Sequence, residues 1–151
     1  MTPWPAKADA LDNWKSNSVP SYGVKLRSVT YGNGRYASVG WYSGADPGYI
    51  ETSADGVTWV PASALTPTNQ IWELFDVAFG NGTFVAVGWS FVCGGGNLYH
   101  STNCIDWTPH SSIPRIANFL GVTYGNGLFV AVGDGETCAG PKTNRNIFTS
   151  S

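Results

Sequence analysis

Apolar residues in this chain gather in short runs rich in Val, Phe and Tyr, and polar or glycine-rich segments separate the runs. Such runs favour β-strands. One arrangement occurs three times, starting at Tyr31, Phe79 and Tyr124: a run ends, an Asn-Gly pair follows, and a second run ends in glycine. Both central residues of a type I′ turn need positive φ, which Asn and Gly tolerate best, so each copy predicts a tight hairpin. The pairs are Asn33-Gly34, Asn81-Gly82 and Asn126-Gly127.

A second motif follows the first two hairpins and ends in a tryptophan, at Trp59 and at Trp107. Trp14 belongs to the same series, because the three tryptophans are 45 and 48 residues apart. A period in the forties made of strands is typical of a β-propeller blade, which is a four-stranded antiparallel sheet. We therefore expect an all-β fold of three blades, without a convincing helix, in which these repeated tryptophans are packing residues.

Each predicted blade holds four strands, and the repeated tryptophan marks its outermost strand. The first strands are expected at Leu26–Tyr31, Leu74–Phe79 and Phe119–Tyr124. The second strands are expected at Arg35–Gly40, Thr83–Gly88 and Leu128–Gly133, and the third at Tyr49–Ser53, Leu98–Thr102 and Ile147–Ser151. Blade 1 would span residues 24–60, blade 2 residues 72–108, and blade 3 residues 117–151 completed by residues 8–18.

The second motif resembles the Asp-box, or sialidase-type BNR, repeat of bacterial β-propellers, which reads roughly Ser-x-Asp-x-Gly-x-Thr-Trp. Here the copy Ser53-Ala-Asp55-Gly56-Val-Thr58-Trp59 is one residue shorter, and Asn103-Cys104 replaces Asp-Gly in the second copy. The resemblance covers nearly the whole chain. It implies a propeller in which the box is a structural turn between the third and fourth strands rather than a catalytic site.

The third copy of this motif is divided between the two ends of the chain. It begins at Thr149, and its tryptophan counterpart is Trp14. Three twisted sheets cannot surround an axis, since propellers usually have four to eight blades. We therefore expect residues 8–18 to complete blade 3 of another copy, in a six-bladed dimer or a nine-bladed trimer. The alternatives are a filament, if the rotation does not close, and an excerpt of a longer propeller.

Charge and hydropathy exclude several classes of partner. Charged residues make up 12% of the chain and the net charge is −2, so nothing favours nucleic acid or an anionic membrane. No apolar run is long enough to span a bilayer. The N-terminus lacks a signal-peptide pattern, yet the low charge and many aromatic residues favour an extracellular or cell-surface location.

Loop lengths vary at one end of the predicted blades. The Asn-Gly turns and the box turns share one end, here called the turn end. The loops between second and third strands, and those between blades, share the other, here called the loop end. Variable loops on a rigid scaffold commonly carry binding sites. Aromatic faces beside hydrogen-bonding groups suit sugar rings. The candidate ligand-binding residues there are Trp41, Tyr42, Trp72, Trp89, His110, Asp134, Glu136 and Arg145.

Catalytic and metal-binding patterns are weak. Sialidase activity, which the resemblance invites, needs an arginine cluster, and Arg27, Arg35, Arg115 and Arg145 do not recur at one blade position. Asp134 and Glu136 could be imagined as a carboxylate pair or as calcium ligands, but solvated loop residues are the simpler interpretation. We expect no enzyme activity, no cofactor and no metal.

The three cysteines divide between the two ends. Cys93 and Cys138 occupy the same offset after their Asn-Gly pairs, in loops of adjacent blades, so a disulfide between them is plausible. Cys104 lies at the turn end, about 15 Å from Cys93 at about 3.3 Å per strand residue, too far for a bridge. Cys104 is therefore expected to be free or intermolecular.

These observations predict a non-catalytic, self-associating β-propeller module with lectin-like carbohydrate binding at the loop end, where several weak sites would gain avidity. One alternative is a structural protein that forms an oligomer or a filament. Another is a protein-interaction propeller domain of a larger surface protein.

Overall fold

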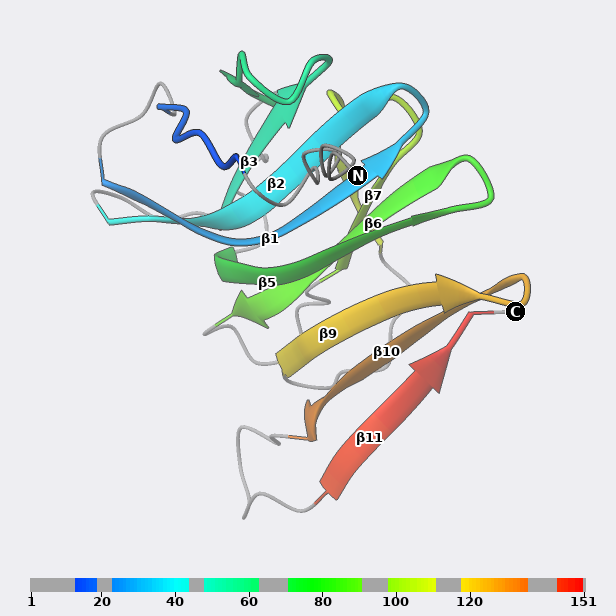
Figure 1. Ribbon diagram of the computed structural model, residues 1–151. Coiled ribbons are helices and arrows are strands. Elements are labelled where there is room, and N and C mark those ends of the chain that lie inside the picture. The colour runs from blue at the N-terminus through cyan, green and yellow to red at the C-terminus, as the bar shows by residue number, and fades with distance from the viewer. Residues whose placement is uncertain are drawn as a thin grey trace, which may run out of the picture.

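The computed structural model describes residues 13–18, 23–43, 48–62, 71–90, 98–110, 118–135 and 144–150. All regular structure in these residues is β-strand, arranged in three antiparallel sheets that follow one another in chain order (Figure 1). Each sheet is a meander in which consecutive strands pair. The predicted all-β fold built from propeller blades is thus confirmed, and the sheets are called blades 1, 2 and 3 below.

Two blades have four strands each and the third has three among the described residues. Blade 1 consists of β1 (Val24–Gly32), β2 (Arg35–Tyr42), β3 (Gly48–Ser53) and β4 (Val60–Pro61). Blade 2 consists of β5 (Ile71–Gly80), β6 (Thr83–Ser90), β7 (Leu98–Ser101) and β8 (Thr108–Pro109). Blade 3 consists of β9 (Asn118–Gly125), β10 (Leu128–Gly135) and β11 (Asn144–Thr149).

The three predicted Asn-Gly hairpins are all present. Asn33, Asn81 and Asn126 have φ of 50°, 46° and 49°, and the glycine after each also has positive φ. In each hairpin the residues that flank the pair are register partners, as for Gly32 and Arg35. The turn chemistry therefore sets the register of the first two strands of every blade.

Several strands extend further toward the loop end than the sequence predicted. Trp41 and Trp89 lie within β2 and β6 rather than after them, and Trp72 lies in β5 rather than in a loop. The glycines at which the second strands were predicted to end lie inside those strands, opposite bulges in the first strands. A Cβ on Gly40 would lie 2.0 Å from the Lys25 carbonyl oxygen, so glycine permits the close approach that lets pairing continue.

The box motifs form the predicted turns between third and fourth strands. In blade 1 the Asp55 carboxylate accepts hydrogen bonds from the backbone N–H groups of Val57 and Thr58, at 2.8 and 2.7 Å. These bonds hold the pKa of Asp55 well below its usual range. In blade 2 the Asn103 side-chain oxygen accepts the two equivalent bonds, each of 2.9 Å. A neutral amide thus replaces the carboxylate without loss of the turn.

Trp14 differs in exposure from the other two repeated tryptophans, and its predicted packing in another copy stays a prediction. Trp107 is buried and Trp59 is partly buried, whereas Trp14 is 83% exposed in the single chain. Residues 13–18 form no strand and are not paired with β11. β1, the first strand after Trp14 in the chain, lies on the opposite side of blade 2 from β11 (Figure 1).

Neighbouring blades approach closely where an aromatic ring covers a glycine. The Phe79 ring lies against Gly32, where a Cβ would be 2.0 Å from its Cγ, and the Tyr124 ring lies in the same way against Gly80. The third glycine of this series, Gly125, has open space at the same position. Blades 1 and 2 thus each receive a ring from the blade that follows in the chain.

Asp76 links the innermost strands of all three blades. Its Oδ1 accepts a 2.6 Å hydrogen bond from the Ser28 hydroxyl in β1, and its Oδ2 accepts a 2.9 Å bond from the Val122 N–H in β9. Arg27 and Glu73 add an ion pair of 2.6 Å between β1 and β5. The order of the blades is therefore held by polar contacts as well as by packing.

Each blade has a forward face, turned toward the next blade in the chain, and a backward face, turned toward the preceding one. The forward face of blade 1, with Val39 and Ile50, and the backward face of blade 2, with Leu74, Phe84 and Tyr99, form one core cluster. A second cluster joins the forward face of blade 2 to the backward face of blade 3. Its members include Val85, Val87, Phe119, Val122 and Ala131.

The ring-on-glycine contact predicts a large difference between two equivalent glycines. Gly80→Ala should lower the free energy of unfolding by about 1–3 kcal/mol, because the new methyl group collides with the Tyr124 ring. Gly125→Ala, where a Cβ meets nothing within 4 Å, should change it by less than about 0.5 kcal/mol. Urea unfolding of dilute protein measures both values, and equal losses would contradict the proposed blade contact.

Candidate functional site

Only part of the predicted loop-end site lies among the described residues. Trp41 and Tyr42 end β2, and Trp89 lies at the equivalent position in β6. Trp72, Asp134 and Arg145 lie in strands, but their side chains are outside the description. Glu136 and the cysteines Cys93 and Cys138 also lie outside the described residues, so their predicted roles remain predictions.

The loop end of blade 1 carries a group of described residues with binding chemistry. The Lys25 ammonium lies 4.9 Å from the centroid of the Trp41 ring, in a cation–π contact between register partners of β1 and β2. Tyr42, the next residue, is 40% exposed. The Trp41 indole N–H is buried and has no hydrogen-bond partner. This group presents one cation and two aromatic rings at the edge of the blade.

Lys25 was missed from the sequence, because its register with Trp41 depends on a bulge that the hairpin turn does not predict. Pairing outward from Asn33-Gly34 places Lys25 opposite Trp41, once the bulge between Leu26 and Ser28 is allowed for. At the same end of blade 3, Asp134 and Arg145 are register partners on β10 and β11. The structure therefore brings this predicted pair together along the backbone.

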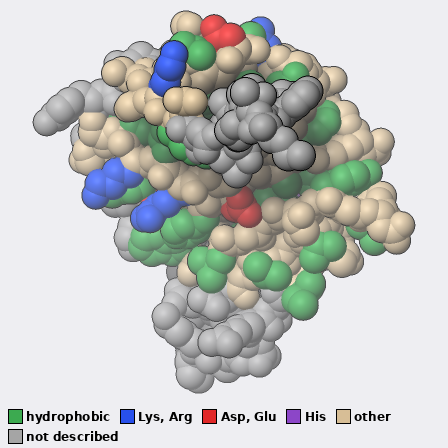
Figure 2. Space-filling view, in the orientation of Figure 1, with side chains coloured by type: hydrophobic (Ala, Val, Ile, Leu, Met, Phe, Trp, Pro, Cys, Tyr) green, Lys and Arg blue, Asp and Glu red, His purple; other side chains and the backbone are tan. Residues whose placement is uncertain are grey.

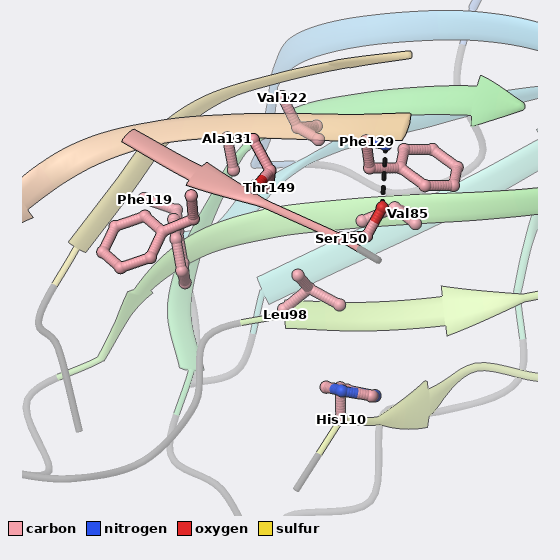
Figure 3. Close-up of a pocket in the computed structure, with 10 residues that line it drawn as sticks. Val85, Leu98, His110, Phe119, Val122, Phe129, Ala131, Thr149 and Ser150 are labelled. Carbon is pink, nitrogen blue, oxygen red and sulfur yellow. Dashed lines mark hydrogen bonds between the residues drawn. The ribbon is translucent and has the colours of Figure 1, made fainter. Parts of the chain in front are cut away.

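His110 lies at the loop end of blade 2, directly after β8, and its backbone N–H donates to the carbonyl oxygen of Leu98. Its ring lies 5.8 Å from that of His100, edge to face. It also lines a cavity of about 270 Å³ between blades 2 and 3 (Figure 3). The other walls are mostly apolar and include Val85, Leu98, Phe119, Phe129 and Phe148.

The cavity opens where blade 3 lacks a fourth strand among the described residues. Figure 3 shows β11 along one side, with the Ser150 hydroxyl accepting a 2.9 Å hydrogen bond from the Phe129 N–H. Ser150 holds the position in blade 3 that Ser53 and Ser101 hold in blades 1 and 2. The hydroxyls of Ser53 and Ser101 accept backbone hydrogen bonds at the start of the box turns. Ser150 is thus already placed as the first residue of a third box turn.

Glu51 is a buried carboxylate that sequence analysis did not single out. It lies in β3 on the backward face of blade 1, at the position held by Tyr99 in blade 2 and Phe148 in blade 3. Burial raises the pKa of Glu51 to about 7, and a hydrogen bond with Tyr49 opposes this effect. Aligning the three β3-type strands would have revealed one acidic residue among two aromatic ones.

Cys104 is free and fully buried in the single chain. It lies at positive φ in the box turn of blade 2. Its sulfur lies 3.2 Å from the Thr52 hydroxyl and 3.4 Å from the Tyr36 carbonyl oxygen, both in blade 1. Burial raises the pKa of this thiol, so Cys104 is a packing residue rather than a reactive one.

Within the described residues, no three His, Cys, Asp or Glu side chains lie together as a metal site would require. The same part of the chain contains no helix that could cross a membrane.

No protein-family model matches the sequence, and no curated protein matches it. Among solved structures, the fold is similar to the native Bacillus subtilis arabinanase Arb43A, at 15% identity and a TM-score of 0.42, covering 73% of this chain and 49% of that one. It is also similar to a GH43 endo-arabinanase from Bacillus licheniformis, at 13% identity and a TM-score of 0.37, covering 81% and 69%. The chain spans about half the length of the first neighbour. Neither likeness informs on activity.

Glu51 predicts a pH-dependent stability. Its folded pKa of about 7 lies above the ordinary value of 4.5, so the folded state holds the proton more tightly than the unfolded state. The resulting stability is fully present below pH 4.5 and is lost as the pH rises through 7. The loss should reach about 3 kcal/mol, at about 1.4 kcal/mol per pKa unit. Urea unfolding of Glu51→Gln between pH 4.5 and 8.5 should lack this component, and an identical slope in both proteins would contradict it.

Proposed function

We propose that this chain is a non-catalytic β-propeller module that associates with copies of itself and binds carbohydrate at its loop end. The observation that carries the proposal is a mismatch between equivalent positions of the three blades. Residues that are buried between blades 1 and 2, and between blades 2 and 3, have exposed apolar counterparts on the two outer faces of the chain.

The forward face of blade 3 is the first of these outer faces. Val39 and Val87 are fully buried on the forward faces of blades 1 and 2, whereas their counterpart Val132 is 44% exposed. Ile50 is 4% exposed in blade 1, and its counterpart Ile147 is 73% exposed. The same side-chain chemistry is thus retained on a face that has no neighbour in the single chain.

The β1 part of the backward face of blade 1 is the second, while Ser38 and Glu51 on the same face are buried. Leu74 and Val77 of blade 2 are buried, whereas their blade 1 counterparts Leu26 and Val29 are 42% and 59% exposed. Tyr31, the counterpart of the ring that covers Gly32, is also exposed. Elsewhere on the molecule, Figure 2 shows hydrophobic side chains at the surface over β9 of blade 3, and Leu120 of that strand is exposed.

These two faces are complementary because each is the missing half of a contact that the chain makes twice internally. The forward face of blade 3 offers Gly125, with open space at its Cβ position, and the backward face of blade 1 offers Tyr31. A head-to-tail contact of this kind gives a closed ring or an open filament, depending on the rotation between copies. The alternative function, a structural protein that forms a filament, would therefore use the same contact in an assembly that does not close into a ring.

Carbohydrate binding is supported by Lys25, Trp41 and Tyr42 at the loop end of blade 1. Aromatic faces stack on the C–H patches of sugar rings, and cationic and amide groups pair with hydroxyl groups. This end of the blades is distant along the strands from the Asn-Gly turns, so a ligand there leaves the blade contacts intact.

We propose that the chain is not catalytic because the described acidic side chains all have structural roles. Asp55 and Asp76 accept backbone hydrogen bonds, Glu73 pairs with Arg27, and Asp106 accepts from Asn103. Glu51 is buried singly on a blade face. These five carboxyl groups are occupied by structural roles rather than gathered in a cleft.

Self-association predicts a mass larger than that of one chain. Light scattering should show multiples of 16.1 kDa for the native sequence. The double variant Val132→Asp, Ile147→Asp should be monomeric, because two uncompensated carboxylates at the contact should weaken association at least about 100-fold. Val60→Asp is the control, since Val60 is exposed although blade 2 is present. A monomeric native chain would contradict self-association.

Carbohydrate binding predicts a separate effect at the loop end. A panel of immobilised oligosaccharides should contain at least one that the chain binds, and Trp41→Ala or Tyr42→Ala should weaken that binding about tenfold or more. Val60→Ala should bind as the native chain does. The absence of binding across the panel, or equal binding by all variants, would remove the carbohydrate proposal and leave assembly.

A further inference from the structure

The cavity between blades 2 and 3 corresponds in position to a filled part of the core between blades 1 and 2. In that core, Cys104 and Trp107 from the segment before β8 pack among residues of both blades. The Trp107 and Phe84 rings lie 6.2 Å apart. Blade 3 has no equivalent of Cys104 or Trp107 among the described residues, and the cavity lies at that place (Figure 3).

The walls of the cavity are the counterparts of the residues around Trp107. Phe129 and Phe148 correspond to Phe84 and Tyr99 on the backward face. Val85 and Leu98 correspond to Ala37 and Ile50 on the forward face. All four residues of the filled site belong to one core cluster with Trp107, and all four of their counterparts line the cavity. The cavity thus has the walls that surround Trp107 in the preceding blade, but no described residue fills it.

The size and lining of the cavity fit an indole ring. Its volume is about 270 Å³ and its walls are mainly aromatic and aliphatic. An apolar cavity of about 150 Å³ in another protein holds benzene. The larger volume here accommodates a bicyclic ring together with part of its strand.

Trp14 is the residue whose spacing matches this site. It precedes Leu26 of β1 by twelve residues, and Trp107 precedes Phe119 of β9 by the same number. Trp107 lies in the blade immediately before β9, so Trp14 belongs to the blade immediately before blade 1. Trp14 is 83% exposed, which shows that no such blade receives it within the single chain.

Blade 3 of the same chain is not that neighbour. Blade 2 separates blades 1 and 3, with β5 lying between β1 and β9 (Figure 1). The spacing from Trp14 to Leu26 equals that from Trp107 to Phe119, which joins adjacent blades. A Trp14 that enters the cavity beside blade 3 is therefore assigned to another molecule.

We propose that Trp14 of a second copy of this chain inserts into the cavity between blades 2 and 3, and that residues 15 and 16 of that copy pair with β11 as its fourth strand. The inference rests on the proposed self-association and names its site. The register follows from blade 2, where Thr108 pairs with His100 and Pro109 with Tyr99. The equivalent pairs are Lys15 with Thr149 and Ser16 with Phe148 of the receiving copy.

An engineered disulfide tests this register directly. Lys15→Cys and Thr149→Cys are combined in a background in which Cys93 and Cys138 are replaced by Ser. Register partners lie about 4.5–5.5 Å apart at Cα, within the range that a disulfide spans. Both native residues are exposed, so neither substitution should disturb the core.

The expected result is a covalent dimer, or a ladder of larger species, on a non-reducing gel. Mixing the two single-cysteine variants should give a mixed disulfide between the two proteins, which only pairing between different copies produces. A control pair, Lys15→Cys with Val60→Cys, should stay monomeric. A covalent monomer from the first pair would overturn the proposal in favour of pairing within one chain, and the absence of cross-links would overturn the docking register.

Trp14→Ala separates this inference from the proposed function. Light scattering of this variant should show at least a tenfold higher concentration for half-dissociation, and Trp14→Phe should restore part of the association. Association that is unchanged in Trp14→Ala would refute the Trp14 site while leaving self-association in place. A native chain that is monomeric at every concentration would refute both.

Discussion

The closeness of neighbouring blades depends on glycine at one position of each blade. Phe79 and Tyr124 place their rings where a Cβ of Gly32 and Gly80 would be, so any larger residue would push two sheets apart. Phe79 packs against the first core cluster, and both clusters lie between the sheets that these rings join, so they need the same sheet separation. Packing at the density of a protein interior leaves little tolerance for such a shift. The repeated Asn-Gly motif thus serves twice, as a hairpin turn through its second glycine and as a docking surface through the glycine before Asn.

Hairpins, blade number and the box turns were predictable because each depends on contacts between residues close in the chain. Asn33-Gly34 and its two repeats adopt positive φ, and Asp55 and Asn103 satisfy the same backbone donors. Strand ends at the loop end were predicted too short, because a glycine opposite a bulge was taken as a terminator. The exposure of Trp14 in the single chain agrees with its place in a motif divided between the two chain ends, but the repeat alone does not identify the molecule that supplies its partner.

The candidate ligand-binding site was predictable only as a region. Trp41 and Tyr42 were identified from their position in the repeat, whereas Lys25 becomes a neighbour through a cross-strand register that includes a bulge. Glu51 could not be recognised as buried from its own segment. Its environment depends on which face of β3 it occupies, and that face is set by the pairing of Ser38 with Glu51. Local sequence patterns do not carry this long-range information.

Asp76 has a consequence for the mechanical behaviour of any assembly of this chain. Its carboxylate joins β1 and β9 to β5, but the equivalent positions in the outer blades are Ser28 and Gly121. A junction between copies, β9 against the next β1, would therefore lack a carboxylate tie near the axis and would be held by side-chain packing and an exchanged strand. Such an assembly would consist of stiff three-blade segments joined by softer seams. Bending, opening and exchange of subunits would then concentrate at the seams, and each segment would move as one body.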